Sequence, residues 1–406
     1  MLSSVLRRGP IEMSGLQIVA IADDLTGALE VGAKFAEHGM TGWVTTNLCQ
    51  PEWQFTRPSP ISLTFDTESR HLSTGAAAES VRRLASLCQS QGVSSIYKKT
   101  DSTLRGNIGS ELNALAQAYP QLPLFYVPAY PRMGRTVRNG HLYVKGIPVN
   151  ETPFAADPLD PVREADIQRL ISLECSAPVI SIRVTDLRAE MKRAIYICDG
   201  EREGEISEAA RFITSRAAGW LAAGPASLAE HIAEQIARRR VRPCYPEIRN
   251  CLVVNGSLNP VSQAQIRHVS RKGWRTAHDS EAPHALSESG WVLLKTGNGD
   301  VRPSAAITQE LGGAVRRILC QSKVDALIVF GGDTATGILE ALECSDVEAI
   351  CELVPGVPLS RASLSGPPGP DSHASRSLYL ITKAGGFAEP DVLCRIRKLL
   401  TERVGE

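Results

Sequence analysis

Two carboxylates, Asp23 and Asp24, stand directly after a short apolar run at residues 18–22 and before a stretch with helical apolar spacing. An unbroken apolar run of this length is typical of a strand covered on both faces. In open α/β sheets, ligands bind where such strands end. The two carboxylates therefore lie at a candidate active-site corner, and the alternative is that Asp24 and Thr26 cap the helix that follows.

A second polar cluster follows the predicted strand at residues 94–97 and contains Lys99, Thr100, Asp101, Ser102 and Arg105. Such a cluster can hold a small polyhydroxylated anion, because the cations take its carboxylate while Asp and Ser bond its hydroxyls. The alternative is a salt-bridged helix start in which Asp101 or Ser102 caps the helix and the basic side chains are solvated.

A third predicted strand, at residues 61–65, leads into Asp66, and Arg70 follows closely. Three strands of the first half therefore lead toward an aspartate. Arg70 and Asp66 are individually weaker indications of a site than the cluster around Asp101, since an isolated Arg near a strand end is more often structural than functional.

In the second half of the chain, Gly331, Gly332, Asp333 and Thr334 lie between a buried strand and a helix. In this context a glycine loop lets backbone amides approach phosphate oxygens. The stretch is not a Walker A sequence, and the chain contains no G-x-G-x-x-G, which disfavours a nicotinamide-binding domain.

Two further glycine-bearing turns follow predicted strands, one containing Ser257 and the other containing Gly385 and Gly386. Any one of the three could be an ordinary tight turn. Their joint placement at equivalent edges of one sheet favours a nucleotide site.

The alternation of short apolar runs with helical patterns predicts an α/β fold of two domains, each a mostly parallel sheet flanked by helices. Residues 1–15 are expected to be a disordered extension, residues 16–242 the first domain, residues 243–248 a linker and residues 249–406 the second domain. Residues 128–163 lack periodicity, which predicts a functional loop. The Ser-, Pro- and Gly-rich residues 360–377 predict a mobile loop.

The composition narrows the class of protein. Lys plus Arg and Asp plus Glu both number 44, so no basic field is available for nucleic acid, and an anionic substrate needs a local cluster of cations. The ten Cys form no C-x-x-C pair, and the eight His show no metal-ligand spacing. No apolar run approaches membrane-spanning length, and no signal peptide is evident, so a cytoplasmic protein with reduced thiols is expected.

Taken together, the motifs resemble those of the four-carbon acid sugar kinases, two-domain enzymes that phosphorylate threonate, erythronate and related sugar acids with ATP. The resemblance covers nearly the whole chain from about residue 16. It rests on residues 21–28, 98–106, 128–131, 224–229, 255–257, 331–334 and 383–387. The form of residues 98–105 is closer to the D-threonate kinase branch than to the 3-oxo-tetronate kinase branch.

The resemblance implies that the first domain holds the sugar acid, that the second holds ATP, and that the active site lies in the cleft between them. The matching positions are, for the sugar acid, Asp23, Arg70, Lys99, Thr100, Asp101 and Ser102, and, for ATP, Ser257, Gly331, Gly332, Asp333, Thr334 and Gly385. Arg105 is added to the sugar-acid set and Gly386 to the ATP set, because each lies close to these positions in the sequence.

The expected reaction is transfer of the γ-phosphoryl group of ATP, with Mg²⁺, to a hydroxyl of the sugar acid, with the 4-hydroxyl as the favoured acceptor. Asp23 is the first candidate for orienting or deprotonating that hydroxyl, and Asp101 is the second. Arg70 and Lys99 would hold the carboxylate. The expected partners are the small molecules alone, without nucleic acid or membrane, and a homodimer is compatible with the sequence.

Two alternatives remain open. One is a kinase for another small hydroxy acid, such as a 3-oxo-tetronate. The other is a sugar-acid sensor that has lost productive ATP binding. It is suggested by Ala388: after the Lys-Ala-Gly turn many members of this family continue Gly-Phe-Gly, whereas this chain has Phe387-Ala388.

Overall fold

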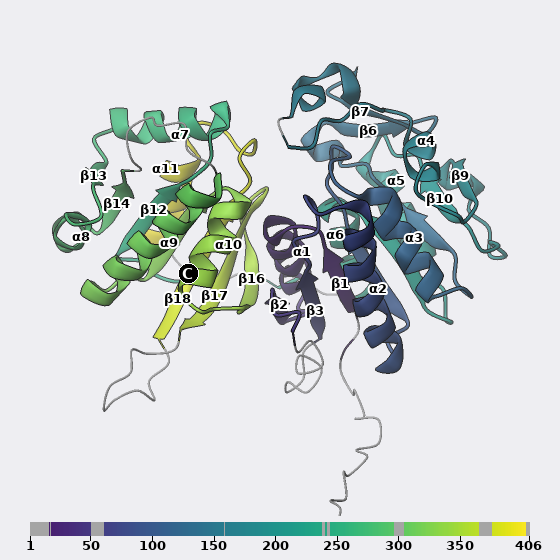
Figure 1. Ribbon diagram of the computed structural model, residues 1–406, viewed down its shortest axis with the longest axis horizontal. Coiled ribbons are helices and arrows are strands. Elements are labelled where there is room, and N and C mark those ends of the chain that lie inside the picture. Colours follow the sequence, from purple (N-terminus) through teal and green to yellow (C-terminus); the bar gives the residue numbers. More distant parts are fainter. Residues whose placement is uncertain are drawn as a thin grey trace, which may run out of the picture. The chain divides into compact units, whose positions relative to one another are not determined.

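The computed structural model describes residues 16, 18–49, 61–157, 159–237, 240–241, 244–295, 304–364 and 376–402, so the predicted extension at residues 1–15 lies outside the described residues. The chain forms two compact units (Figure 1). One comprises residues up to 21 together with 47–236, and the other comprises residues 22–46 together with 237 onward. Each is built on a largely parallel sheet that carries helices, which confirms the predicted two-domain α/β class.

The first unit contains a sheet in the strand order β3-β1-β4-β11-β5-β10-β9. The pairs from β4 to β9 are parallel, as βαβ connections require. Its strands are β1 (Ile18–Ala22), β3 (Ser62–Asp66), β4 (Ser95–Lys99), β5 (Leu124–Tyr126), β9 (Val179–Ile182), β10 (Ile195–Cys198) and β11 (Trp220–Gly224), and its helices are α2 (Thr74–Ser90), α3 (Ile108–Ala118), α4 (Ile167–Ser172), α5 (Glu203–Thr214) and α6 (Ala226–Ala237).

The second unit has the strand order β13-β14-β12-β15-β18-β17-β16-β2, which is parallel from β13 to β18 and antiparallel beyond. The strands are β2 (Gly42–Thr45), β12 (Cys251–Asn255), β13 (Arg275–Ala277), β14 (Trp291–Leu294), β15 (Ala326–Phe330), β16 (Asp346–Val354), β17 (Val357–Leu364) and β18 (Arg376–Lys383). The helices are α1 (Leu25–Glu37), α7 (Pro260–Arg271), α8 (Ala282–Ser289), α9 (Ser304–Gln321), α10 (Gly332–Ala341) and α11 (Val392–Thr401).

Two apolar cores lie on the sheet of the second unit. One includes Leu25 and Leu29 of α1 together with residues of α8, α9 and α10, and the other includes residues of α7 and α11. Because the parallel strands are covered on both sides, they are continuous apolar runs, as the sequence pattern predicted.

The stretch at residues 128–163, expected to be an irregular functional loop, instead contains a small antiparallel sheet. It consists of β6 (Arg135–Arg138), β7 (His141–Val144) and β8 (Ile147–Pro148). The connecting pairs Asn139-Gly140 and Lys145-Gly146 have positive φ at both residues, which is the conformation of tight hairpin turns. The Asn-Gly pair was the sequence signal for this hairpin.

Strands also occupy both ends of residues 360–377, where a mobile loop was expected. Strand β17 runs to Leu364, and β18 begins at Arg376, while residues 365–375 lie outside the described residues. Within the expected linker, residues 244–248 form neither helix nor strand. None of the helices in the described ranges has the length and apolarity needed to cross a bilayer.

Candidate functional site

Three glycine-bearing turns of the second unit lie side by side, as expected. They follow β12, β15 and β18, which are parallel neighbours in the sheet. Asn255 at the end of β12 pairs with Phe330, and Phe330 pairs with Lys383 at the end of β18, so the three chains leave the sheet at one edge. The prediction that these turns share an edge is therefore confirmed.

Close contacts between these turns explain their glycines. A Cβ at Gly256 would lie 2.0 Å from the Thr334 hydroxyl oxygen, and a Cβ at Gly385 would lie 2.8 Å from the Ser257 hydroxyl oxygen. Gly331 has φ +105°, a conformation that side chains disfavour. Thr334, Ser257 and Gly385 consequently line one small region.

The first amides of α10 face this region without protein acceptors. The N–H of Gly331 donates to the Lys383 carbonyl at 3.1 Å, and the N–H of Ala335 donates to Gly331 at 3.1 Å. Among the described residues, no acceptor is found for the N–H groups of Gly332, Asp333 and Thr334. Free amides at a helix N-terminus are a ready anion site, so this edge of the sheet suits a phosphate group.

Lys383, which the sequence argument did not single out, organises the third turn. Its buried ammonium donates to the carbonyls of Ala384, Gly385 and Phe387 at 2.8, 3.1 and 2.9 Å and lies 4.9 Å from the centre of the Phe330 ring. Burial lowers the pKa of Lys383 to about 7. The available signal was a lysine at a strand end directly before the Ala-Gly-Gly turn.

Ala388 lies just beyond this turn in the left-handed region, with φ +63°. The Gln265 amide donates to the carbonyls of Phe387, Ala388 and Glu389 at 2.9, 2.8 and 3.1 Å. The turn is therefore held in place although an alanine occupies a conformation that glycine adopts more easily.

In the first unit, the turn after β3 and the turn after β4 are tied together. The Asn107 amide donates to the carbonyls of Ser69, Arg70 and Leu72 at 3.0, 3.3 and 2.9 Å. Arg70 is close enough for its charge to act on Asp101. The structure therefore brings Arg70 together with the cluster that begins at Lys99.

Asp101 lies within an ion pair. Its carboxylate accepts from the Thr103 N–H at 3.0 Å and from the Arg105 side chain at 2.8 and 3.1 Å. Burial by itself would raise the pKa of Asp101, but the charges of Arg105 and Arg70 outweigh it and hold the pKa well below its usual range. Arg105 also reaches Asp157 at 3.3 Å. Part of the cluster thus follows the salt-bridged alternative.

Lys99 and Thr100 contrast with that pair. Lys99 is 4% exposed, and its ammonium makes no hydrogen bond or ion pair in the part of the chain that the structure describes. The Thr100 hydroxyl is buried and has no partner among those residues. The preceding Lys98, in contrast, pairs with Glu111 at 2.9 Å. The Lys99 side chain is therefore largely buried without a counterion in the described residues, and an anionic ligand would supply one.

Asp23 and Asp24 have different environments. Asp24 is the N-cap of α1 and accepts from the Gly27 N–H at 3.0 Å, so its capping role is confirmed. Thr26 lies inside the helix and is not the cap, which corrects that part of the expectation. Asp23 directly follows β1 and is 2% exposed.

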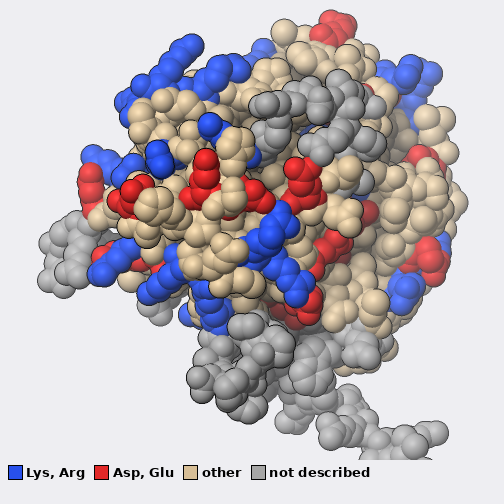
Figure 2. All heavy atoms as spheres, turned by 60° about the vertical axis from the view of Figure 1, so that its left-hand side comes forward, with Lys and Arg blue, Asp and Glu red and all other residues tan. Residues whose placement is uncertain are grey.

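Elsewhere, all ten Cys are free, and burial raises the pKa of Cys88, Cys198 and Cys351 to about 12. On the face in Figure 2, the described Lys and Arg side chains are interspersed with Asp and Glu, as the balanced composition predicted.

A phosphate-type site on one α/β unit and an uncompensated cation among hydroxyls on the other define a two-domain kinase for a small anionic substrate. Residues 18–232 match the family described as sugar-binding N-terminal domain, and residues 293–393 match the family described as nucleotide-binding C-terminal domain. The chain belongs to the four-carbon acid sugar kinases, and it is a sugar-acid kinase, as its motifs predicted.

Known relatives extend along nearly the whole chain. A protein of Bordetella bronchiseptica named D-threonate kinase is 29% identical, covering 96% of this chain and 99% of the relative. A protein of Brucella melitensis named 3-oxo-tetronate kinase is 23% identical, covering 97% and 98%. The solved structure of Haemophilus influenzae protein HI1011 has 19% identity and a TM-score of 0.71 over 94% of this chain and 100% of that chain, which supports the fold.

Proposed function

We propose that this kinase transfers the γ-phosphoryl group of ATP, bound with Mg²⁺, to the 4-hydroxyl of a four-carbon sugar acid of the threonate or erythronate type. The Lys99 side chain, which is 4% exposed and has no counterion among the described residues, is the observation that carries the proposal. The similarity to a protein named D-threonate kinase supports threonate as the first substrate to test.

The carboxylate of the sugar acid is assigned to Lys99, with Arg70 as the second cation. The hydroxyls of Thr100 and Ser102 are assigned to the sugar hydroxyls, because they adjoin Lys99 and can both donate and accept. A sugar acid held by its carboxylate presents its far end for reaction, which favours the 4-hydroxyl. Asp101 acts indirectly, since it fixes the Arg105 guanidinium.

On the nucleotide side, the phosphates are assigned to the free amides of Gly332, Asp333 and Thr334. Ser257, Gly385 and Gly386 would form the facing wall. This donor set suits a polyphosphate, because helix N-terminal amides carry partial positive charge and need no side-chain cation. Bound Mg²⁺ would neutralise the charge that develops on the phosphate oxygens during transfer.

Asp23 is the proposed group that orients or deprotonates the attacking hydroxyl. Asp101 is less suited to this role, because its low pKa makes it a weak proton acceptor and its oxygens already accept from Arg105 and Thr103. Phosphoryl transfer depends mainly on positioning and charge neutralisation, so orientation of the hydroxyl is expected to be the larger part of the role of Asp23.

A substrate screen tests this proposal. The purified protein is assayed with Mg·ATP against the threonate and erythronate stereoisomers and a 3-oxo-tetronate, and D-threonate is expected to give the highest kcat/KM. Highest activity with the 3-oxo-tetronate would assign the chain to that substrate class instead. Absence of turnover across the whole panel would contradict the proposal.

A further inference from the structure

Helix α1 lies within the match to the sugar-binding domain, but it packs in the compact unit that carries the nucleotide turns. Its residues Leu25 and Leu29 share an apolar core with Val254 of β12 and Val329 of β15. The packing fixes α1 relative to the strands that precede the phosphate-type turns.

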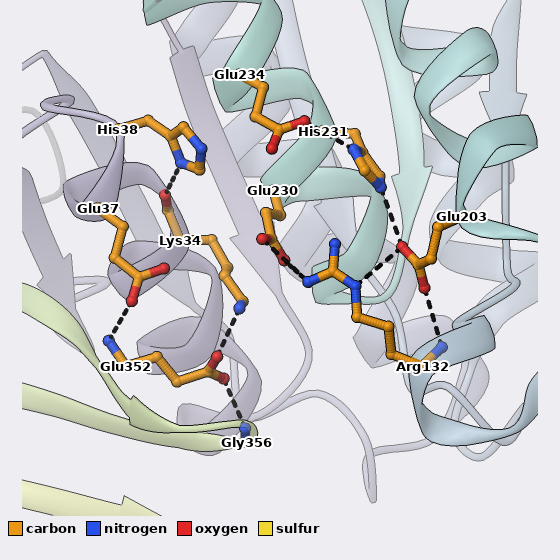
Figure 3. A network of polar contacts seen from close by, with 10 residues as sticks. All are labelled: Lys34, Glu37, His38, Arg132, Glu203, Glu230, His231, Glu234, Glu352 and Gly356. Carbon is orange, nitrogen blue, oxygen red and sulfur yellow. Dashed lines mark hydrogen bonds and ion pairs between the residues drawn. The ribbon is translucent and has the colours of Figure 1, made fainter. Parts of the chain in front are cut away.

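Polar contacts hold the far end of α1 as well. The buried Lys34 ammonium pairs with Glu352 of β16 at 2.5 Å, and the Glu37 carboxylate accepts from the Glu352 N–H at 3.0 Å (Figure 3). Because both ends of the helix are anchored in this unit, the side chains of its first turn have defined positions beside α10.

The first turn of α1 meets the first residue of α10. A Cβ at Gly332 would lie 3.1 Å from the Thr26 hydroxyl oxygen and 3.9 Å from a carboxylate oxygen of Asp24. Gly332 is not among the residues with positive φ, so its backbone does not demand glycine. The absence of a side chain leaves the N-terminus of α10 open toward Thr26.

The Thr26 hydroxyl makes no hydrogen bond to another described residue. Thr26 is 6% exposed, and its hydroxyl oxygen is buried with no hydrogen-bond partner in the described ranges. A buried hydroxyl without a partner is unfavourable. It lies 3.1 Å from the position of a Cβ at Gly332, whose N–H also has no acceptor in those ranges. An anion bound at this helix N-terminus would accept hydrogen bonds from both the unpartnered hydroxyl and the free amides.

We propose that the Thr26 hydroxyl donates to an oxygen of the terminal phosphate of ATP at the N-terminus of α10. This inference rests on the proposed function and adds a residue to its nucleotide site. The neighbouring Asp24 carboxylate would repel a bare phosphate, so the site favours a phosphate complexed with a divalent cation. Thr26 thereby distinguishes the triphosphate from the diphosphate.

Calorimetric titration of the full chain tests the inference with Mg·ADP and with a non-hydrolysable Mg·ATP analogue. Thr26→Val keeps the shape of the side chain and removes the hydroxyl, while Thr26→Ser retains the hydroxyl. The valine variant is expected to lose about tenfold or more in affinity for the ATP analogue and to bind ADP like the wild type. The serine variant should bind both nucleotides nearly normally.

Equal affinities of wild type and Thr26→Val for the ATP analogue would overturn the inference. Equal losses for ADP and the analogue would also overturn it, because they would indicate a structural role. Thermal unfolding of each variant checks that it is folded. If the valine variant is unfolded, the serine variant is used for the test instead. A serine variant that loses affinity for both nucleotides alike would contradict the inference. A wild-type chain that binds neither nucleotide would instead refute the proposed function itself.

Discussion

At the scale of single residues, two adjacent lysines have contrasting environments. Lys98 is paired with Glu111, whereas Lys99 has no counterion among the described residues. The sequence presents both as neighbours in one motif and does not distinguish them. Their surroundings in the structure make them a matched pair for mutagenesis.

Replacing Lys99 with Met is expected to raise KM for the sugar acid at least about 100-fold, because a charge-assisted contact to the substrate carboxylate is lost, while the folded state is retained. Replacing Lys98 with Met is expected to destabilise the protein by about 3–5 kcal/mol, since the buried Glu111 carboxylate loses its ion pair with Lys98. Steady-state kinetics and urea unfolding measure the two effects. A Lys99→Met variant with normal KM would contradict the assigned role.

Asp23 and Asp101 form a second informative pair. Asp23→Asn is expected to lower kcat by about 100-fold or more with unfolding unchanged, because it removes the group assigned to the acceptor hydroxyl. Asp101→Asn is expected to lower stability as well, because the partly buried Arg105 loses a charged partner. Rate assays and denaturation curves on both variants distinguish the roles. Full activity in Asp23→Asn would show that another group orients the hydroxyl.

At the scale of elements, the turn after β18 leads to Ala388, the residue that motivated the alternative of a sugar-acid sensor. Ala388 holds φ +63° because the Gln265 amide secures the surrounding carbonyls. Ala388→Gly is expected to stabilise the protein by about 1 kcal/mol, since the left-handed conformation costs alanine roughly that much. Urea unfolding measures the change. A less stable glycine variant would indicate that the alanine side chain makes a favourable contact.

A second element-scale feature joins the start of the small-sheet region to α5 and α6. Arg132 pairs with Glu230 at 3.0 Å and with Glu203 at 3.2 Å, and His231 contacts Glu203 and Glu234 at 3.1 and 2.9 Å (Figure 3). Burial lowers the pKa of His231, but the hydrogen bonds to the two carboxylates outweigh it and raise the pKa above its usual value.

The raised pKa makes part of the stability depend on pH. Protonated His231 stabilises the folded state fully below about pH 6.5, and this contribution is lost as the pH rises through the raised folded pKa. The free energy of unfolding of wild type minus that of His231→Gln, measured in urea, is therefore expected to fall as the pH rises from about 6 to about 9. A difference that stays constant with pH would contradict a titrating His231 in this network.

The ability to predict elements from sequence depended on their length and periodicity. The apolar run before Asp23 and the helical pattern after it were found, because both elements are fully buried and their apolar patterns are unbroken. The β16–β17 hairpin was missed, although the alternating burial of β16 has the period of two that is typical of a half-buried strand. Within the site, the glycines could be found from their types, whereas Gln265 could not, because the carbonyls that it contacts lie more than 100 residues away in the sequence.

At the scale of the whole molecule, the two compact units are not two consecutive halves of the sequence. Residues 22–46 lie inside the sugar-binding match but pack with the C-terminal residues. Sequence patterns predicted two α/β domains, and that is the architecture observed. No pattern could assign α1 to the second unit, because that depends on the core it shares with Val254 and Val329.

The central claim, phosphorylation of a four-carbon sugar acid at its 4-hydroxyl, is tested most directly by phosphorus NMR of the product formed from D-threonate and Mg·ATP. The account predicts a new phosphomonoester signal split into a triplet by the two protons on C4, together with ADP. A doublet would place the phosphate on C2 or C3, and ATP left unchanged in the presence of every tetronate would contradict the account.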